Sequence, residues 1–84
     1  MKTLTIQLAH LAAVTAEIAL NFPMGNSCKG HNVGKSTAYL RTAKQIGGQD
    51  LAINAYSNAL SDYRGQDLES LRRIERDLSD SLGK

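Results

Sequence analysis

Proline and glycine divide this chain of 84 residues into four segments, each with the apolar spacing of a helix. Pro23 closes the first segment, because a proline ring disfavours the helical conformation of the residue before it. The pair Gly47-Gly48 closes the second segment and Gly65 the third, since glycine adopts the conformations in which helices commonly end. Within the segments apolar residues recur at steps of three and four. The sequence therefore predicts an all-α fold, with three to four short helices in a compact or hairpin-like bundle.

The predicted elements form a single helical domain over residues 1–84, since a chain of this length holds one modest core. A basic loop rich in glycine and asparagine, 23–35, is expected between the first two helices. Asn32 or Ser36 would cap the second helix, because short polar side chains accept hydrogen bonds from free amides. Asp50 and Asp67 would cap the third and fourth. The helices are expected at about 3–22, 36–46, 50–63 and 67–82.

The first segment combines an apolar stripe with many alanines. Alanine is the best helix former, and a face of small residues lets a second helix approach closely. His10 falls on the opposite, polar side, where we expect it to be solvated. The apolar stripes of the first and last helices are expected to supply buried contact with a partner. They comprise Leu4, Leu8, Leu11, Ile18 and Phe22 in the first helix, and Leu68, Leu71, Ile74, Leu78 and Leu82 in the last.

Charge is unevenly distributed along the chain, although the formal net charge is only +2. No acidic residue occurs between Glu17 and Asp50, whereas the last third mixes acidic residues with arginine. A stretch with charge of one sign attracts a partner of the opposite sign and steers its approach. The predicted surface for an anionic partner consists of Lys29, His31, Lys35, Ser36, Arg41 and Lys44.

Residues 29–37, KGHNVGKST, contain part of a phosphate-binding loop pattern. Gly34, Lys35 and Ser36 supply its end, but its first glycine would have to stand one position before Gly30. The preceding residues, NFPMGNSC, do not form the buried strand that such a loop follows. A helix start with free amides and nearby lysines still attracts anions. A phosphorylated-ligand site at this helix start is therefore a third functional hypothesis, and a capped, solvated helix start is the plain interpretation.

Cys28 and His31 have the spacing of two metal ligands, or of a nucleophile and its base. Two ligands make only half of a zinc site, and the other histidine of the chain is His10. A nucleophilic cysteine needs a histidine that a third group orients. We therefore expect no catalytic residue, no metal and no cofactor. A single cysteine also excludes an internal disulfide and slightly favours the cytoplasm.

Residues 42–54, TAKQIGGQDLAIN, have the spacing of a helix-turn-helix. Ala43 would pack where two helices cross, Gly47 would make the turn, and Ile53 would be the apolar residue of the second helix. Over residues 39–60 the chain resembles the helix-turn-helix of Cro-type phage repressors, with TAK before the turn and AIN after it. The same segment has the spacing of the second helix of a tetratricopeptide repeat, of which the chain would hold one half.

The resemblance to Cro-type repressors implies DNA binding, with residues 51–63 as the recognition helix. The chain departs from that family at Gly48, where the family has a buried aliphatic residue. It departs again at Asp50, where a polar or basic residue normally faces DNA. The implied DNA-binding residues are Lys44 near phosphate, and Gln49, Asn54 and Asn58 near base edges.

The leading hypothesis is a small non-enzymatic regulatory or inhibitory protein, as many phage and mobile-element proteins of this size are by analogy. Its basic loop and second helix would meet the acidic surface of a protein partner. The alternative is a helix-turn-helix transcriptional regulator that binds nucleic acid. No apolar run approaches the ~20 residues of a membrane span, so we expect a cytoplasmic protein without a membrane partner. A second copy of the chain is a further partner that could complete the small core.

Overall fold

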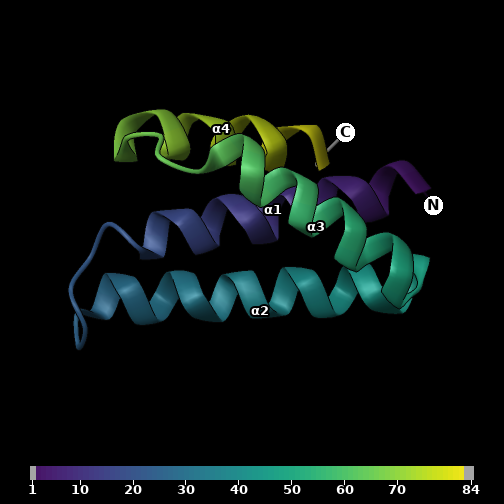
Figure 1. The fold of residues 1–84 in the computed structure, drawn as a ribbon, viewed down its shortest axis with the longest axis horizontal. Coiled ribbons are helices and arrows are strands. Elements are labelled where there is room, and N and C mark those ends of the chain that lie inside the picture. Colours follow the sequence, from purple (N-terminus) through teal and green to yellow (C-terminus); the bar gives the residue numbers. More distant parts are fainter. Residues whose placement is uncertain (1, 83–84) are drawn as a thin grey trace.

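The computed structural model describes residues 2–82, which form four α-helices joined by short connections (Figure 1). The helices are α1 (Lys2–Ala19), α2 (Ser27–Gly47), α3 (Gln49–Tyr63) and α4 (Leu68–Leu82). No strand occurs among these residues, so the prediction of an all-α helical bundle is confirmed. None of the described helices has both the length and the apolar character that a membrane span requires.

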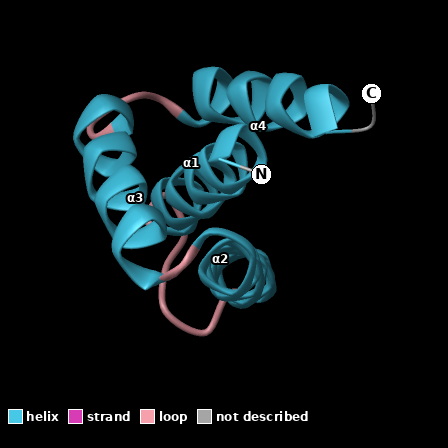
Figure 2. Cartoon of the chain, turned by 90° about the vertical axis from the view of Figure 1, so that its right-hand side faces the viewer, coloured by secondary structure: helices cyan, strands magenta, loops and turns pink. Residues whose placement is uncertain are grey.

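α1 is the central helix, and the other three pack around it (Figure 2). Ten of its 18 residues are buried, including every alanine except Ala16. A helix that is apolar on most of its sides is stable only when other elements surround it. The predicted division of this helix into one apolar and one polar side is therefore only partly correct.

The large apolar side chains of α1 form a core with α4. Leu11, Val14 and Ile18 are almost fully buried and cluster with Leu71 of α4. The other leucines and the isoleucine of α4 are half-buried around this cluster. The apolar stripes of the first and last helices therefore cover each other, which corrects the expectation that they would cover a partner.

The alanines of α1 provide the surface on which α2 and α3 pack. α3 buries only three residues, which are Ala52, Ala55 and Ala59. Ser36 of α2 is buried, and its hydroxyl donates a hydrogen bond to the Ala12 carbonyl at 2.7 Å. Small residues let helices approach until a side chain of one reaches the backbone of the next. The central position of α1 follows from this close approach.

Two glycines with separate roles connect α2 to α3. Gly48 is the residue between the two helices; its φ is 89°, and its amide donates to the Lys44 carbonyl at 2.9 Å. Gly47 is helical and lies against Thr5 of α1, where a Cβ would be 2.7 Å from the Thr5 Cβ. The turn predicted at Gly47 is therefore made by Gly48, and Gly47 permits the close approach of α2 to α1.

α2 begins more than two turns earlier than predicted, so most of the expected loop over 23–35 is helical. Asn26 caps the helix and accepts a hydrogen bond from the Cys28 amide at 2.8 Å. The two predicted caps, Asn32 and Ser36, lie inside the helix and are buried. The predicted helix start at residue 36 is therefore wrong.

Two helical glycines account for this error. Gly30 and Gly34 lie inside α2, although glycine costs about 1 kcal/mol relative to alanine in a helix interior. At both positions no neighbouring atom lies within 4 Å of the place that a Cβ would occupy, so packing does not require glycine. The burial of Ser36 against α1 favours a continuous helix, and tertiary packing commonly overrides local propensity.

The other helix starts lie close to their predicted positions. Asp67 caps α4 as expected, and its carboxylate accepts a hydrogen bond from the Ser70 amide at 2.9 Å. The hydrogen bonds from the Ser70 side chain and backbone hold the pKa of the Asp67 carboxyl below its usual value. Asp50 does not cap α3 as predicted, because it lies within the first turn of that helix and Gly48 precedes it.

The two glycine environments of α2 predict opposite effects for the same substitution. Gly47→Ala should lower the free energy of unfolding by about 1–3 kcal/mol, because the new methyl group overlaps the buried Thr5. Gly34→Ala should raise it by about 0.5–1 kcal/mol, because alanine favours the helix and meets no neighbour. Urea unfolding followed by circular dichroism measures both values, and equal effects would contradict the close α1–α2 approach.

Candidate functional site

Two of the six residues predicted to face an anionic partner instead hold α1 in place. The ammonium group of Lys29 donates hydrogen bonds to the carbonyls of Ala19 and Phe22, both at 3.2 Å. Lys29 thereby caps the end of α1, where free carbonyls favour a positive charge. Ser36 is buried and bonded to the Ala12 carbonyl. Both residues are therefore structural.

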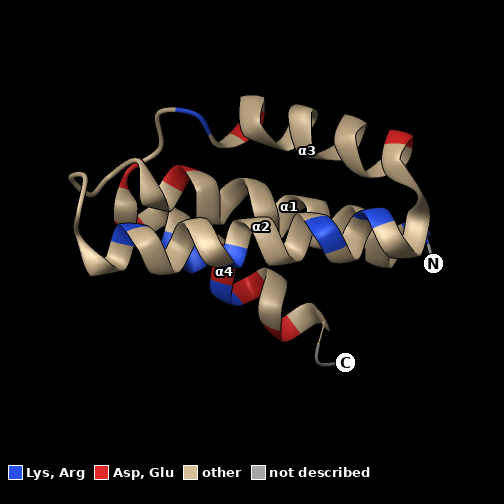
Figure 3. Cartoon of the chain, turned by 90° about the horizontal axis from the view of Figure 1, so that it is seen from below, with Lys and Arg blue, Asp and Glu red and all other residues tan. Residues whose placement is uncertain are grey.

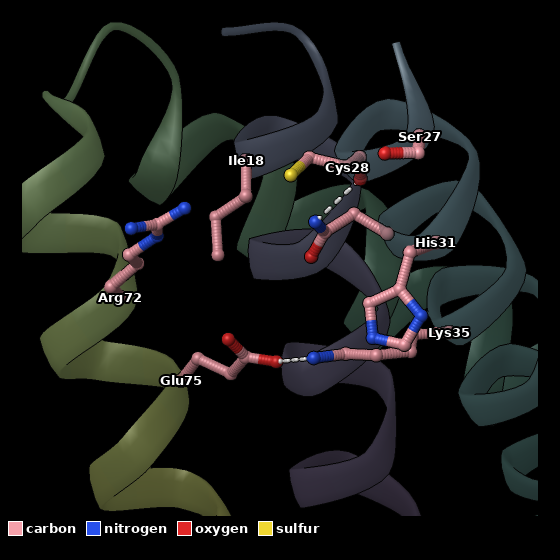
Figure 4. Close-up of a pocket in the computed structure, with 8 residues that line it drawn as sticks. Ile18, Ser27, Cys28, His31, Lys35, Arg72 and Glu75 are labelled. Atoms are coloured by element: carbon pink, nitrogen blue, oxygen red, sulfur yellow. Dashed lines mark hydrogen bonds and ion pairs between the residues drawn. The ribbon is translucent and has the colours of Figure 1, made fainter. Parts of the chain in front are cut away.

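A third predicted residue, Lys35, forms an ion pair with Glu75 of α4 (Figure 4). The two side chains are 32% and 18% exposed, so water screens this pair less than a pair on the open surface. The contact links α2 to α4, each of which packs mainly on α1. Lys35 therefore contributes to the fold rather than offering a free charge to a partner.

The Lys35–Glu75 pair crosses a groove of about 550 Å³ between α2 and α4. Cys28 and His31 also line this groove, and in Figure 4 the Cys28 thiol points toward Ile18 while the His31 ring lies beside Lys35. Among residues 2–82, no three histidine, cysteine, aspartate or glutamate side chains come together in a way that could hold a metal ion. The groove is a surface of mixed charge, because Glu75 forms its ion pair with Lys35 there.

His10 is half-buried and has a partner, which corrects the prediction that it is solvated. Its Nδ1 lies 2.7 Å from the hydroxyl of Tyr63, and the two rings meet edge to face with centroids 5.7 Å apart. Burial, and to a lesser extent the negative charge of Asp62, raises the pKa of the Tyr63 phenol above its ordinary value. The phenol therefore keeps its proton, and the pair joins α1 to the end of α3.

Arg41 and Lys44 lie on the other flank of α2, along a groove that faces α3. Two adjoining hollows of about 340 and 310 Å³ form this groove and share Ser36, Thr37 and Tyr56. Of the residues that the structure describes, no aspartate or glutamate lines either hollow. We name these two hollows together the α2–α3 groove.

One end of the α2–α3 groove is apolar and open to solvent. Ala16 and Ala19 of α1 line it, together with Leu20 and Val33, which are 70% and 49% exposed. Neighbouring apolar side chains that stay exposed in a folded domain mark surfaces that bind other molecules. This surface was not predicted from the sequence, because Val33 fell in the loop expected over residues 23–35. Placing Val33 on one helix with Thr37 and Lys44 would have revealed a continuous face.

The predicted basic surface is therefore divided between two flanks of α2. Basic positions are spread along this helix, whereas α3 carries acidic positions only (Figure 3). His31 is exposed, but it lies in the groove that contains Glu75. In the described part of the chain, neither Arg41 nor Lys44 forms an ion pair. These two cations retain a charge that an external partner can meet.

The phosphate-site hypothesis required a helix start that the structure places elsewhere. Gly34, Lys35 and Ser36 lie in the interior of α2, where backbone amides are bonded within the helix. The amides that a helix start leaves free follow Asn26 instead. The helix start predicted at these three residues is therefore wrong, and the phosphorylated-ligand hypothesis loses the feature on which it depended.

The residues implied in base contact by the helix-turn-helix resemblance, Gln49, Asn54 and Asn58, are all exposed on α3. α3 also contains Asp50 and Asp62 and has no lysine or arginine, so positive charge for phosphate contact would have to come from other segments. DNA binding stays a prediction.

No protein-family model, curated protein or solved structure matches the chain. The candidate functional site is therefore defined by geometry and charge. It is the α2–α3 groove, which combines exposed apolar side chains with two cations, Arg41 and Lys44, that form no ion pair within residues 2–82.

The structural role of Lys35 predicts measurable coupling with Glu75. Lys35→Glu and Glu75→Lys should each destabilise the protein, and the double swap should recover about 0.5–1 kcal/mol beyond additivity. Urea unfolding of the four proteins gives this coupling free energy. The matched control is the Glu69–Arg73 pair, whose side chains are 83% and 61% exposed and whose coupling should be weaker. Equal coupling in the two pairs would contradict the structural role of Lys35.

Proposed function

We propose that this chain is a small non-enzymatic regulatory or inhibitory protein that binds a macromolecular partner through the α2–α3 groove. Two observations carry the proposal. Among the described residues, no aspartate or glutamate lines the groove beside Arg41 and Lys44, and neither cation forms an ion pair. Val33 and Leu20 are exposed in the same groove. A cation that forms no ion pair with the described part of its own chain favours an acidic partner.

The charged and the apolar side chains of the groove would have different roles in binding. Arg41 is exposed at the rim of the groove, where charges mainly accelerate and orient the approach of a partner. Burial of apolar side chains such as Leu20 and Val33 would supply most of the affinity. We therefore still propose an acidic partner, as the sequence predicts. The proposed contact surface is now one flank of α2 rather than all of its basic residues.

The non-enzymatic character is supported by how the reactive side chains are used. His10 is bonded to Tyr63, and Lys35 is paired with Glu75. Such contacts hold helices together and engage these side chains within the fold. Binding rather than chemistry is therefore the function that the described surface favours.

The alternative, a helix-turn-helix transcriptional regulator, is less favoured by the charge of α3. Asp50 and Asp62 stand at its two ends, and a duplex presents a dense row of phosphates. A nucleic-acid backbone also offers little apolar surface against which residues such as Val33 could be buried. A protein partner uses both features of the groove, so it is the first candidate.

Affinity purification of the tagged chain from the cell that encodes it tests the proposal. We expect one protein in stoichiometric amount. Arg41→Glu should reduce its recovery about three- to tenfold, because an acidic partner is then repelled at the rim. The matched control, Arg76→Glu on the exposed surface of α4, makes the same charge change away from the groove and should leave recovery unchanged. Recovery of nucleic acid alone, or of no specific partner, would refute the proposal.

A further inference from the structure

The dimensions of the α2–α3 groove fit a short helix. Val33 lines one end and Lys44 the other, and these residues are three turns apart on α2, about 16 Å at the rise of an α-helix. Tyr56 of α3 lines both hollows, so they form one continuous channel beside α2. An α-helix of about three turns has the length of this channel.

The walls of the groove require an occupant with one apolar face. Val33 and Leu20 are exposed at one end, and Tyr56 is half-buried on the α3 side. Apolar residues at i, i+3 or i+4, and i+7 of a docked helix would meet these side chains.

The charges of the groove require an occupant that is also acidic. Arg41 and Lys44 line one end, and among the described residues no carboxylate lines either hollow. Lys29 lines the apolar end, but its ammonium group is bonded to the carbonyls at the end of α1. The mixed-charge groove on the other flank of α2 differs in this respect, since Glu75 is paired there with Lys35. Carboxylates at the edges of a docked helix would complement these cations.

The described helices of a second copy of this chain do not fit these requirements. The apolar stripe of α4 already covers α1, around the cluster that contains Leu71. α3 contains acidic residues, but its exposed face is polar and includes Asn54 and Asn58. It therefore offers no apolar face to the groove. Nucleic acid would satisfy the cations but would leave the apolar wall uncovered. The remaining occupant is a helix that is acidic and amphipathic and that belongs to another protein.

We infer that the α2–α3 groove receives an amphipathic acidic helix of the partner protein. The inference rests on the proposed function and specifies the chemistry of the partner. Apolar residues on one face of the bound helix cover Val33, Leu20 and Tyr56, while its carboxylates meet Arg41 and Lys44.

A phage-displayed library of 16-residue peptides, built on a helix-favouring framework with randomised positions, tests the inference with the purified chain as bait. Enriched peptides should carry apolar residues at i, i+3 or i+4, and i+7, flanked by an excess of aspartate and glutamate. Fluorescence anisotropy of the most enriched peptide should then show at least about tenfold weaker binding to the double variant Arg41→Glu, Lys44→Glu. Val33→Glu should weaken binding similarly, because it places an acid in the apolar end.

The control is Arg64→Glu, Arg76→Glu, which makes the same net charge change at exposed positions outside the groove and should bind the peptide like the parent. Thermal unfolding confirms that all variants are folded. Enrichment of basic or aperiodic peptides, the absence of enrichment, or equal binding by the groove variants would each overturn the inference. If affinity purification still recovers a protein in an Arg41-dependent way, only the helical occupant is refuted and the proposed function stands.

Discussion

The close approach of α2 and α3 to the central helix is the constraint on which the rest of the structure depends. It is possible because α1 presents alanines and because α2 ends in Gly47, which lies directly against Thr5. Alanine buries little apolar surface, so these two contacts gain less from hydrophobic burial than the leucine-rich contact with α4. Hydrogen bonds and caps add to them, in particular the bond from Ser36 to the Ala12 carbonyl.

The groove follows from this arrangement. α3 packs on α1 through three alanines. A single residue, Gly48, connects α3 to the end of α2. Larger side chains that point between α2 and α3, such as Tyr56 and Val33, therefore remain partly or largely exposed. The same packing that builds a minimal core leaves an apolar channel on the surface. In the described part of the chain, Arg41 and Lys44 beside that channel form no ion pair, whereas Lys29 and Lys35 serve the fold.

The class of fold could be read from the sequence, because helical spacing and the breakers Pro23, Gly48 and Gly65 are local signals. The start of α2 could not, since Gly30 and Gly34 favour a loop locally and the helix is stabilised by distant contacts with α1. The roles of Lys29 and Lys35 were also hidden. Their partners are a helix end and a carboxylate 40 residues away, and linear charge patterning does not reveal such pairs. The segment without acidic residues contains α2, the helix that lines the proposed site. Its sequence does not show which of its cations have partners within the fold.

Native-state hydrogen exchange tests the central position of α1 most directly. If α1 is the helix around which the others pack, its buried amides, from Leu8 to Ile18, can exchange only when the whole domain unfolds. Their exchange free energies should equal the global free energy of unfolding, and they should be the slowest of the four helices. Slower exchange in α2 or α4 than in α1, or exchange of α1 through local opening, would contradict the account.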